Sequence, residues 1–152
     1  MPTGKTRSAG WQIGVSRTVP RPVEDVWRVI TSPAGTATWL GEGVRLPAEP
    51  GTSYETTDGT VGEIRSYWPD DRIRLTWRPR GWDRPSVVQV TVSDGSSGNG
   101  AKAVLRFHQE QLADADQRER QRRHWVDVIE RLQRQLASDR KSVARLSVAL
   151  LD

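Results

Sequence analysis

The feature that most constrains the fold is a long amphipathic helix near the C-terminal end of the chain. From Gln117 to Ala137 the sequence contains no glycine or proline. Within this stretch, four large apolar residues recur at spacings of four, three and four: Trp125, Ile129, Leu132 and Leu136. These spacings place the four side chains in one stripe along a helix. Because a single stripe has to be buried against another layer, the helix predicts a partner layer elsewhere in the chain.

The partner layer is expected to be a sheet. Most of the sequence between Gly51 and Gln109 alternates apolar and polar residues with a period of two between turn signals. An earlier strand, residues 11–19, is followed by Pro22 and Pro33, each of which marks the start of a short helix. We therefore predict an α+β helix-grip fold, in which a curled antiparallel β-sheet of about six strands grips one long C-terminal α-helix and two short helices follow the first strand.

One folded domain is expected, covering residues 10–138. Residues 1–9 are polar and basic and predict a flexible N-terminal tail. Residues 139–152 begin with a polar run, after which the apolar stripe resumes, so they predict a helical extension or tail. Such a segment can extend the helix, fold back or pair with another subunit. Both a monomer and a homodimer are therefore compatible with the sequence.

Composition excludes several classes of site. The chain has no cysteine, which rules out disulfides and thiolate metal sites. No apolar run is long enough to span a membrane and no signal peptide is recognisable, so the expected location is cytoplasmic. The only histidines, His108 and His124, form no recognisable catalytic or metal-binding constellation with their neighbours. The sequence therefore predicts no catalytic residue, no metal and no cofactor.

The positive charge of the chain is concentrated in the long helix. Residues 117–145 contain nine arginines or lysines and four acidic residues, whereas the rest of the chain has a net charge of −1. One interpretation is a stripe that binds nucleic-acid phosphates. The other is a solvated helix face with charge pairs such as Asp127 with Arg131. No nucleic-acid-binding motif accompanies the charge, which favours the solvated face and argues against a nucleic-acid partner.

Three segments resemble a known superfamily. They are SRTVPRPVEDVWRVITSP, DGTVGEIRSYWPDDRIRLTW, and AVLRFHQEQL followed by HWVDVIERLQRQL. Over about residues 11–137 the chain resembles the START-like (SRPBCC) helix-grip superfamily, and within it the bacterial family related to the activator of heat shock protein 90 ATPase. That family commonly has glycine directly before the helix tryptophan. The resemblance therefore implies that His124 widens the gap between helix and sheet or places a polar group at the mouth of a pocket.

The resemblance implies a set of cavity residues. Helix-grip proteins often keep the space between sheet and long helix open as a cavity for a small hydrophobic ligand, and aromatic walls suit such a site. The expected ligand-binding residues are Arg17, Trp39, Tyr54, Trp77, Phe107, Trp125 and Ile129. A filled interior, in which the same aromatic residues simply pack together, is the alternative.

Arg17 is the most specific polar candidate. It falls on the apolar face of its strand, where a guanidinium group is costly unless it is paired. We expect it either to form an ion pair with Glu55 or Glu63, or to hold the polar end of a ligand together with Tyr54.

A basic and aromatic loop adds candidates for partner binding: Arg80, Trp82 and Arg84. The loop is expected to anchor a protein interface, to cover the cavity mouth as a lid, or to pack Trp82 on the sheet edge. The leading functional expectation is a non-catalytic domain that binds a small hydrophobic or amphipathic molecule. The resemblance implies a second class, a protein–protein regulator of a chaperone. A third class is an enzyme, since some helix-grip relatives act as cyclases or hydrolases.

Overall fold

The computed structural model describes residues 5–6, 10–96, 98 and 100–151, with side chains described from residue 10 to residue 139 within those ranges. The strands are β1 (Lys5–Thr6), β2 (Gly10–Val19), β3 (Ser53–Glu55), β4 (Val61–Trp68), β5 (Arg72–Trp77), β6 (Ser86–Asp94) and β7 (Ala103–Leu112). The helices are α1 (Val23–Thr31), α2 (Pro33–Trp39) and α3 (Ala115–Leu151).

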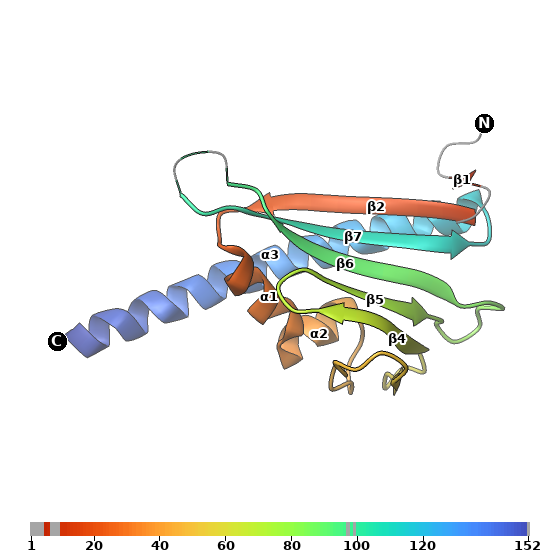
Figure 1. The fold of residues 1–152 in the computed structure, drawn as a ribbon, viewed down its shortest axis with the longest axis horizontal. Helices are drawn as coiled ribbons and strands as arrows, with labels where there is room; N and C mark the ends of the chain where they lie inside the picture. The colour runs from red at the N-terminus through yellow and green to blue at the C-terminus, as the bar shows by residue number, and fades with distance from the viewer. Residues whose placement is uncertain (1–4, 7–9, 97, 99, 152) are drawn as a thin grey trace.

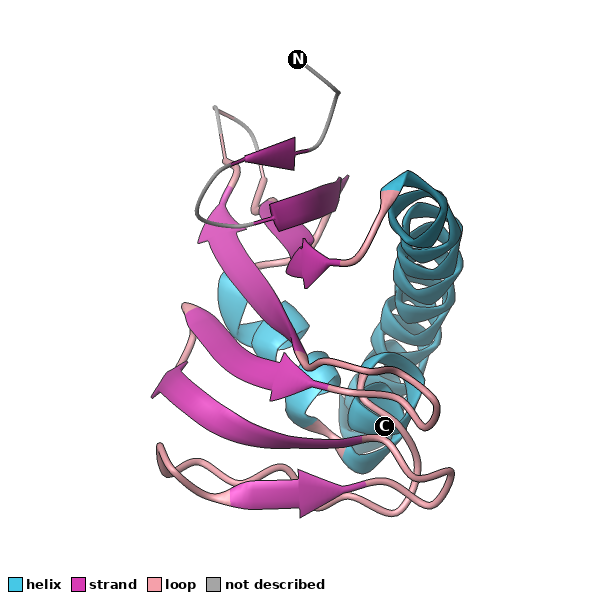
Figure 2. Cartoon of the chain, turned by 90° about the vertical axis from the view of Figure 1, so that its right-hand side faces the viewer, coloured by secondary structure: helices cyan, strands magenta, loops and turns pink. Residues whose placement is uncertain are grey.

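All strands belong to one antiparallel sheet with the order β1-β2-β7-β6-β5-β4-β3. The sheet curves around α3, which lies along one of its faces (Figures 1 and 2). The predicted α+β helix-grip fold is therefore confirmed, with six strands of three or more residues and the two-residue β1. Lys5–Thr6, which belong to the predicted tail, form β1, and the other residues of that tail lie outside the described residues.

The two short helices meet at a tight corner. The Ser32 hydroxyl accepts a hydrogen bond of 3.1 Å from the Gly35 amide, which caps the start of α2, and Pro33 occupies its first turn. A Cβ atom at Gly35 would lie 1.8 Å from the Val29 carbonyl oxygen. Only glycine therefore allows α2 to fold back so closely on the end of α1.

The stripe on α3 is buried as predicted. Trp125, Ile129 and Leu132 are fully buried and Leu136 is 3% exposed. They pack against the inward residues of the sheet and against α1 and α2. At about 25 cal/mol per Å² of apolar surface removed from water, this stripe is the main contribution that holds α3 to the sheet.

An ionic clamp fastens α3 near the end of this buried stripe. The clamp consists of Arg21, Asp25, Arg28 and Asp139. The Arg21 guanidinium donates to the Leu136 carbonyl oxygen at 2.7 Å, to Asp25 at 2.8 Å and to Asp139 at 3.0 Å. Arg28 forms a second ion pair with Asp139 at 2.9 Å. Beyond this point the helix continues without a break to Leu151 and projects past the sheet (Figure 1).

Candidate functional site

The interface between sheet and α3 is filled by a chain of aromatic rings. The rings of Phe107 and Trp125 are stacked, with centroids 4.8 Å apart. Trp39 lies 6.0 Å from Phe107 on one side, and Trp77 lies 6.0 Å from Trp125 on the other. We call these four residues the aromatic stack. Each is less than a tenth exposed, as is the neighbouring Ile129. Five predicted cavity residues therefore do meet, and they pack against one another.

A buried hydrogen-bond network supports the stack. The Gln109 side-chain oxygen accepts from Trp125 Nε1 at 2.8 Å and from Gln121 Nε2 at 2.9 Å. The Gln109 amide group donates to the Ser86 hydroxyl at 2.9 Å, and Ser86 donates to the Trp77 carbonyl oxygen at 2.7 Å. The network fixes the Trp125 ring and joins β5, β6, β7 and α3. Sequence reasoning missed it, although a polar Gln109 on the inward face of β7 was the signal.

Two polar atoms beside this network have no hydrogen-bond partner. They are Nε1 of Trp77 and Nε2 of His124, in rings whose centroids lie 5.8 Å apart. Trp77 is 7% exposed, so its N–H group is shielded from solvent. Burial also lowers the pKa of His124 below its ordinary value, which keeps the imidazole neutral. The polar group that His124 was expected to bring to this interface is thus present, facing a tryptophan.

Trp82 packs against the Trp77 member of this pair from the loop between β5 and β6. Its ring meets Trp77 edge-on, with centroids 5.5 Å apart, and it is partly buried. Arg78 holds the loop by donating from Nε to the Trp82 carbonyl oxygen at 2.8 Å. Of the three expected roles for Trp82, packing on the end of the sheet describes its position.

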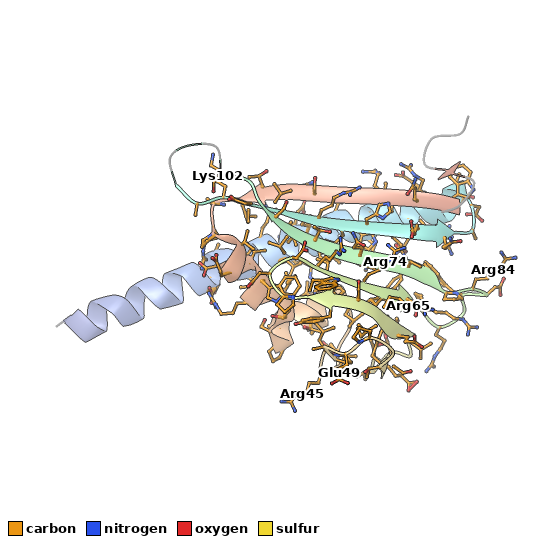
Figure 3. The ribbon with its side chains drawn as sticks, viewed as in Figure 1. Arg45, Glu49, Arg65, Arg74, Arg84 and Lys102 are labelled. Atoms are coloured by element: carbon orange, nitrogen blue, oxygen red, sulfur yellow. The ribbon has the colours of Figure 1, made fainter. Side chains whose placement is uncertain are left out.

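Arg80 and Arg84 do not accompany Trp82. Both are exposed, and Arg80 lies over the β3–β4 turn, where a Cβ atom at Gly59 would come within 2.7 Å of its guanidinium group. Arg84 extends away from the body (Figure 3). The three predicted partner-binding residues therefore face different directions.

A surface groove is also lined by Trp82. It has a volume of about 620 Å³ and is lined by the loop from Gly81 to Pro85, by the β7–α3 connection and by the first turns of α3, including Gln117 and Arg120. Trp82 therefore lines the groove and also contacts Trp77 of the aromatic stack.

Tyr54 lies apart from the aromatic stack. It is on β3, at the opposite edge of the sheet from β2, and its ring packs over Gly62. Its hydroxyl group donates to the Thr76 carbonyl oxygen at 2.5 Å, and burial raises its pKa. Tyr54 instead lines a separate open groove of about 550 Å³.

Arg17 lies on β2, in the part of the strand that does not pair with β1, and its side chain is partly exposed. Its guanidinium group donates to the Ser16 carbonyl oxygen at 2.8 Å. The expected ion pair with Glu55 or Glu63 is wrong, because β7, β6 and β5 separate β2 from β4. Within the described part of the chain, Glu63 pairs with Arg65 instead.

Two further properties of the described residues bear on function. Among them, no group of three or more histidine and acidic side chains could hold a metal ion. None of the helices in the described part of the chain is long and apolar enough to cross a membrane.

Comparison with solved structures identifies proteins of the same fold. DynU16, from the dynemicin biosynthetic locus, superposes with a TM-score of 0.67 at 24% identity over 84% of this chain, which spans 48% of DynU16. A protein from Mesorhizobium loti gives a TM-score of 0.64 at 24% identity, covering 84% of this chain and 97% of the other. An HSP90 activator from Plasmodium falciparum gives a TM-score of 0.54 at 16% identity, covering 67% and 74%.

These identities establish a shared fold. A search of curated protein sequences finds no significant match. The sequence does match a family model over residues 20–137, which is most of the chain. The chain therefore belongs to the Activator of Hsp90 ATPase homolog 1-like protein family.

Proposed function

We propose that this protein is a non-catalytic binding domain for a small amphipathic molecule. The ligand has a flat apolar body and one hydrogen-bond acceptor, and it binds at the end of the aromatic stack, between Trp77, His124 and Trp82. Family membership supports a ligand-binding or regulatory domain in general terms. The position and chemistry of the site are our proposal.

The observation that carries the proposal is the unpaired N–H group of Trp77. Its ring is more than nine-tenths buried, yet Nε1 has no acceptor. A buried donor without a partner costs about 1–3 kcal/mol. A ligand that supplies a carbonyl or ether oxygen recovers this free energy, and the surrounding rings add about 25 cal/mol per Å² of apolar surface buried. The geometry therefore favours a ligand that combines both properties.

Trp82 supplies the route into the site. Its ring contacts Trp77 and also lines the surface groove, and in this proposal turning the ring aside opens a path from the groove to the unpaired N–H group. Gly81 precedes it with φ +91° and no atoms near its Cβ position, which gives the loop a pivot. In this proposal the loop from residue 78 to residue 85 acts as a lid.

The chemistry of the two histidines supports a non-catalytic role. The His108 ring nitrogen Nε2 is hydrogen-bonded to the Gln12 side chain at 2.9 Å on the outer face of the sheet. His124 lies on the opposite side of the sheet with an unpaired Nε2. Among the described residues neither has the hydrogen-bonded carboxylate that would orient it as a general base.

Titration calorimetry with a matched pair of ligands tests the proposal. Naphthyl methyl ketone has a flat apolar body and an acceptor, whereas ethylnaphthalene has the same body without one. We expect the ketone to bind about fivefold to tenfold more tightly. Trp77→Phe, which removes the N–H group and keeps an aromatic ring, should abolish that preference. Trp68→Phe, on the outer face of the sheet, is the matched control and should retain it.

Two results would overturn the proposal. One is the absence of binding by both ligands. The other is a ketone preference that survives in Trp77→Phe. A stopped-flow measurement tests the lid separately, because Trp82→Ala should bind the ketone faster than the unmodified protein does. An unchanged association rate would show that Trp82 is not a lid, without contradicting the proposed binding site.

We propose regulation of a chaperone as the alternative function, and the family match supports it. In that case the protein should raise the ATPase rate of purified HSP90. Charge reversal in Arg80→Glu with Arg84→Glu should remove the increase if these residues contact the partner. An ATPase rate that does not respond to an excess of the protein would exclude this alternative.

A further inference from the structure

The outer face of the sheet carries a row of residues that crosses five strands in register. Trp68 on β4 pairs with Arg72 on β5, and Arg72 pairs with Thr91 on β6. Thr91 pairs with Arg106 on β7, and Arg106 pairs with Ser16 on β2. Their neighbours along each strand point to the buried side, so these five side chains lie on the face away from α3. In Figure 1 this face is turned toward the viewer, with α3 behind the sheet.

Trp68 is an apolar anchor on this face. It is 55% exposed and is the exposed large hydrophobic residue of the described part of the chain. Every other tryptophan there is packed against or within the core. Exposed tryptophan is strongly enriched among residues that dominate binding at protein interfaces. Trp68 lies at the β4 end of the row, next to Arg72, and its ring is accessible to solvent.

The outer face also has an excess of positive charge. Its two carboxylates on the long strands are already neutralised: Glu110 pairs with Arg74, and Glu63 pairs with Arg65 at 3.4 Å. Figure 3 shows Arg74 over the middle of the sheet and Arg65 over β4. The remaining guanidinium groups of this face are therefore left without a strand carboxylate.

Those remaining groups belong to Arg72 and Arg106. Both are exposed, and neither forms an ion pair within the described ranges, although Asp70 and Asp71 lie in the turn next to Arg72. The Arg106 side chain lies flat across Gly14, where a Cβ atom would come within 2.9 Å of its guanidinium group. The glycine thus leaves room for the guanidinium group of Arg106 to lie across β2.

We propose that this face docks an acidic, extended segment of a partner protein. The segment places one apolar side chain on Trp68 and carboxylates on Arg72 and Arg106. The two arginines are two strands apart, which is about 9.6 Å. Residues two apart in an extended chain lie on the same face about 7 Å apart, and the length of the glutamate and arginine side chains covers the remaining distance to both cations. A single exposed ring favours a peptide over single-stranded nucleic acid, which stacks successive bases on several aromatic residues.

This surface is independent of the proposed ligand site, because the two lie on opposite faces of the sheet. Fluorescence anisotropy with a labelled peptide tests it. The probe contains one leucine and two glutamates two positions apart in a serine and threonine background, and the control probe has glutamine in place of glutamate. We expect the acidic peptide to bind with a Kd below about 1 mM and the glutamine peptide to bind at least about tenfold more weakly.

Single variants identify the surface. Trp68→Ala, Arg72→Gln and Arg106→Gln should each weaken acidic-peptide binding by about fivefold or more. Arg84→Gln removes the same charge from the β5–β6 loop and should change binding by less than about twofold. All four positions are exposed, so thermal melts of the variants should match that of the unmodified protein.

Three outcomes would overturn the proposal. The first is an equal loss in Arg84→Gln, which would mean non-specific attraction to a basic protein. The second is equal affinity for the glutamine peptide. The third is tighter binding of a thymidine oligonucleotide through the same three residues, which would assign the face to nucleic acid.

Discussion

The two ends of the interface between α3 and the rest of the domain are held by opposite means. At one end, the ionic clamp pairs its buried cation completely: Arg21 contacts Asp25, Asp139 and the Leu136 carbonyl oxygen within 3.0 Å. At the other end the aromatic stack provides apolar packing, but Nε1 of Trp77 and Nε2 of His124 are left unpaired. The buried cation at the end where α3 leaves the sheet is therefore paired, whereas the buried N–H group of Trp77 at the other end is not, although Gln135 Oε1 beside the clamp also lacks a partner.

The end of the interface with the unpaired donor is the end that can respond to a ligand. Removing one member of the clamp would leave the remaining charges partly buried without a partner, which costs much free energy. The clamp therefore holds this end of the helix in place. At the aromatic end a new acceptor lowers the free energy, because the buried N–H group of Trp77 still lacks one. We expect the clamp to serve as the fixed point while adjustments for a ligand occur around Trp82. Four predictions test the contrast.

The largest effect is expected at the clamp. Arg21→Met should lower the free energy of unfolding by about 3 kcal/mol, because it leaves Asp25 and Asp139 without their most buried partner. Urea unfolding followed by circular dichroism measures the change. Arg131→Met, which removes an exposed ion pair with Asp127 on the same helix, should cost less than about 0.5 kcal/mol. Equal costs for the two variants would show that the clamp is an ordinary surface cluster.

The second prediction compares paired and unpaired polar groups at the aromatic end. Gln109→Leu should cost about 2 kcal/mol, because it leaves Trp125 Nε1 and Gln121 Nε2 without an acceptor. His124→Leu removes a group with no partner at Nε2, so it should be neutral or stabilise by up to about 1 kcal/mol. The same unfolding measurement checks both. Destabilisation by His124→Leu as large as that by Gln109→Leu would mean that His124 contributes a hydrogen bond or packing of comparable value.

Periodicity in the sequence was enough to predict the packing layer. The stripe from Trp125 to Leu136 and the inward residues of β5 and β7 lie where their spacing placed them, since burial follows directly from a period of 3.6 or 2. Polar partners were not predictable in the same way. The sequence suggested Glu55 or Glu63 as an ion-pair partner for Arg17, but pairing depends on strand order, and the order puts at least three strands between β2 and either glutamate.

Local sequence also could not predict the two ends of the interface. Arg21 lies in the connection before α1, and its partner Asp139 is 118 residues away. The contact depends on where α3 ends its path across the sheet, and no local pattern encodes that position. Gln109 was detectable as a polar residue on an apolar face, and this is the one signal by which the buried network could have been expected.

The third prediction concerns acid denaturation at the clamp. The guanidinium groups of Arg28 and Arg21 lower the pKa of Asp139 from its ordinary 3.8 to about 2. A depressed carboxyl pKa contributes stability that is present above pH 3.8 and is lost as the pH falls toward 2. Asp139→Asn should therefore cost about 1–2 kcal/mol near neutral pH and flatten the acid limb of the stability curve. If the stability curve of Asp139→Asn is shifted but as steep below pH 3.8 as that of the unmodified protein, the acid sensitivity does not come from Asp139.

The smallest effect is expected at the aromatic end and at higher pH. Burial lowers the pKa of both His124 and His108 below the ordinary 6.5. Since the unfolded chain binds these protons more readily, stability is fully present above pH 6.5 and decreases as the pH falls below it. From about pH 7 to pH 5 the free energy of unfolding should fall by about 1 kcal/mol or less for each histidine.

Single variants divide this pH dependence between the two faces of the sheet. His124→Leu should remove the share that belongs to the aromatic end, and His108→Gln the share from the outer face. The double variant should be independent of pH in this range, because the described carboxylates with shifted pKa values titrate below it. A bound ketone that accepts from Trp77 also buries His124 more deeply. It should therefore increase the part of the pH dependence of stability that is due to His124, and leave the part due to His108 unchanged. If the ligand increases the part of the pH dependence that is due to His108 instead, it binds on the outer face of the sheet. The unpaired atoms of Trp77 and His124 are then not its site.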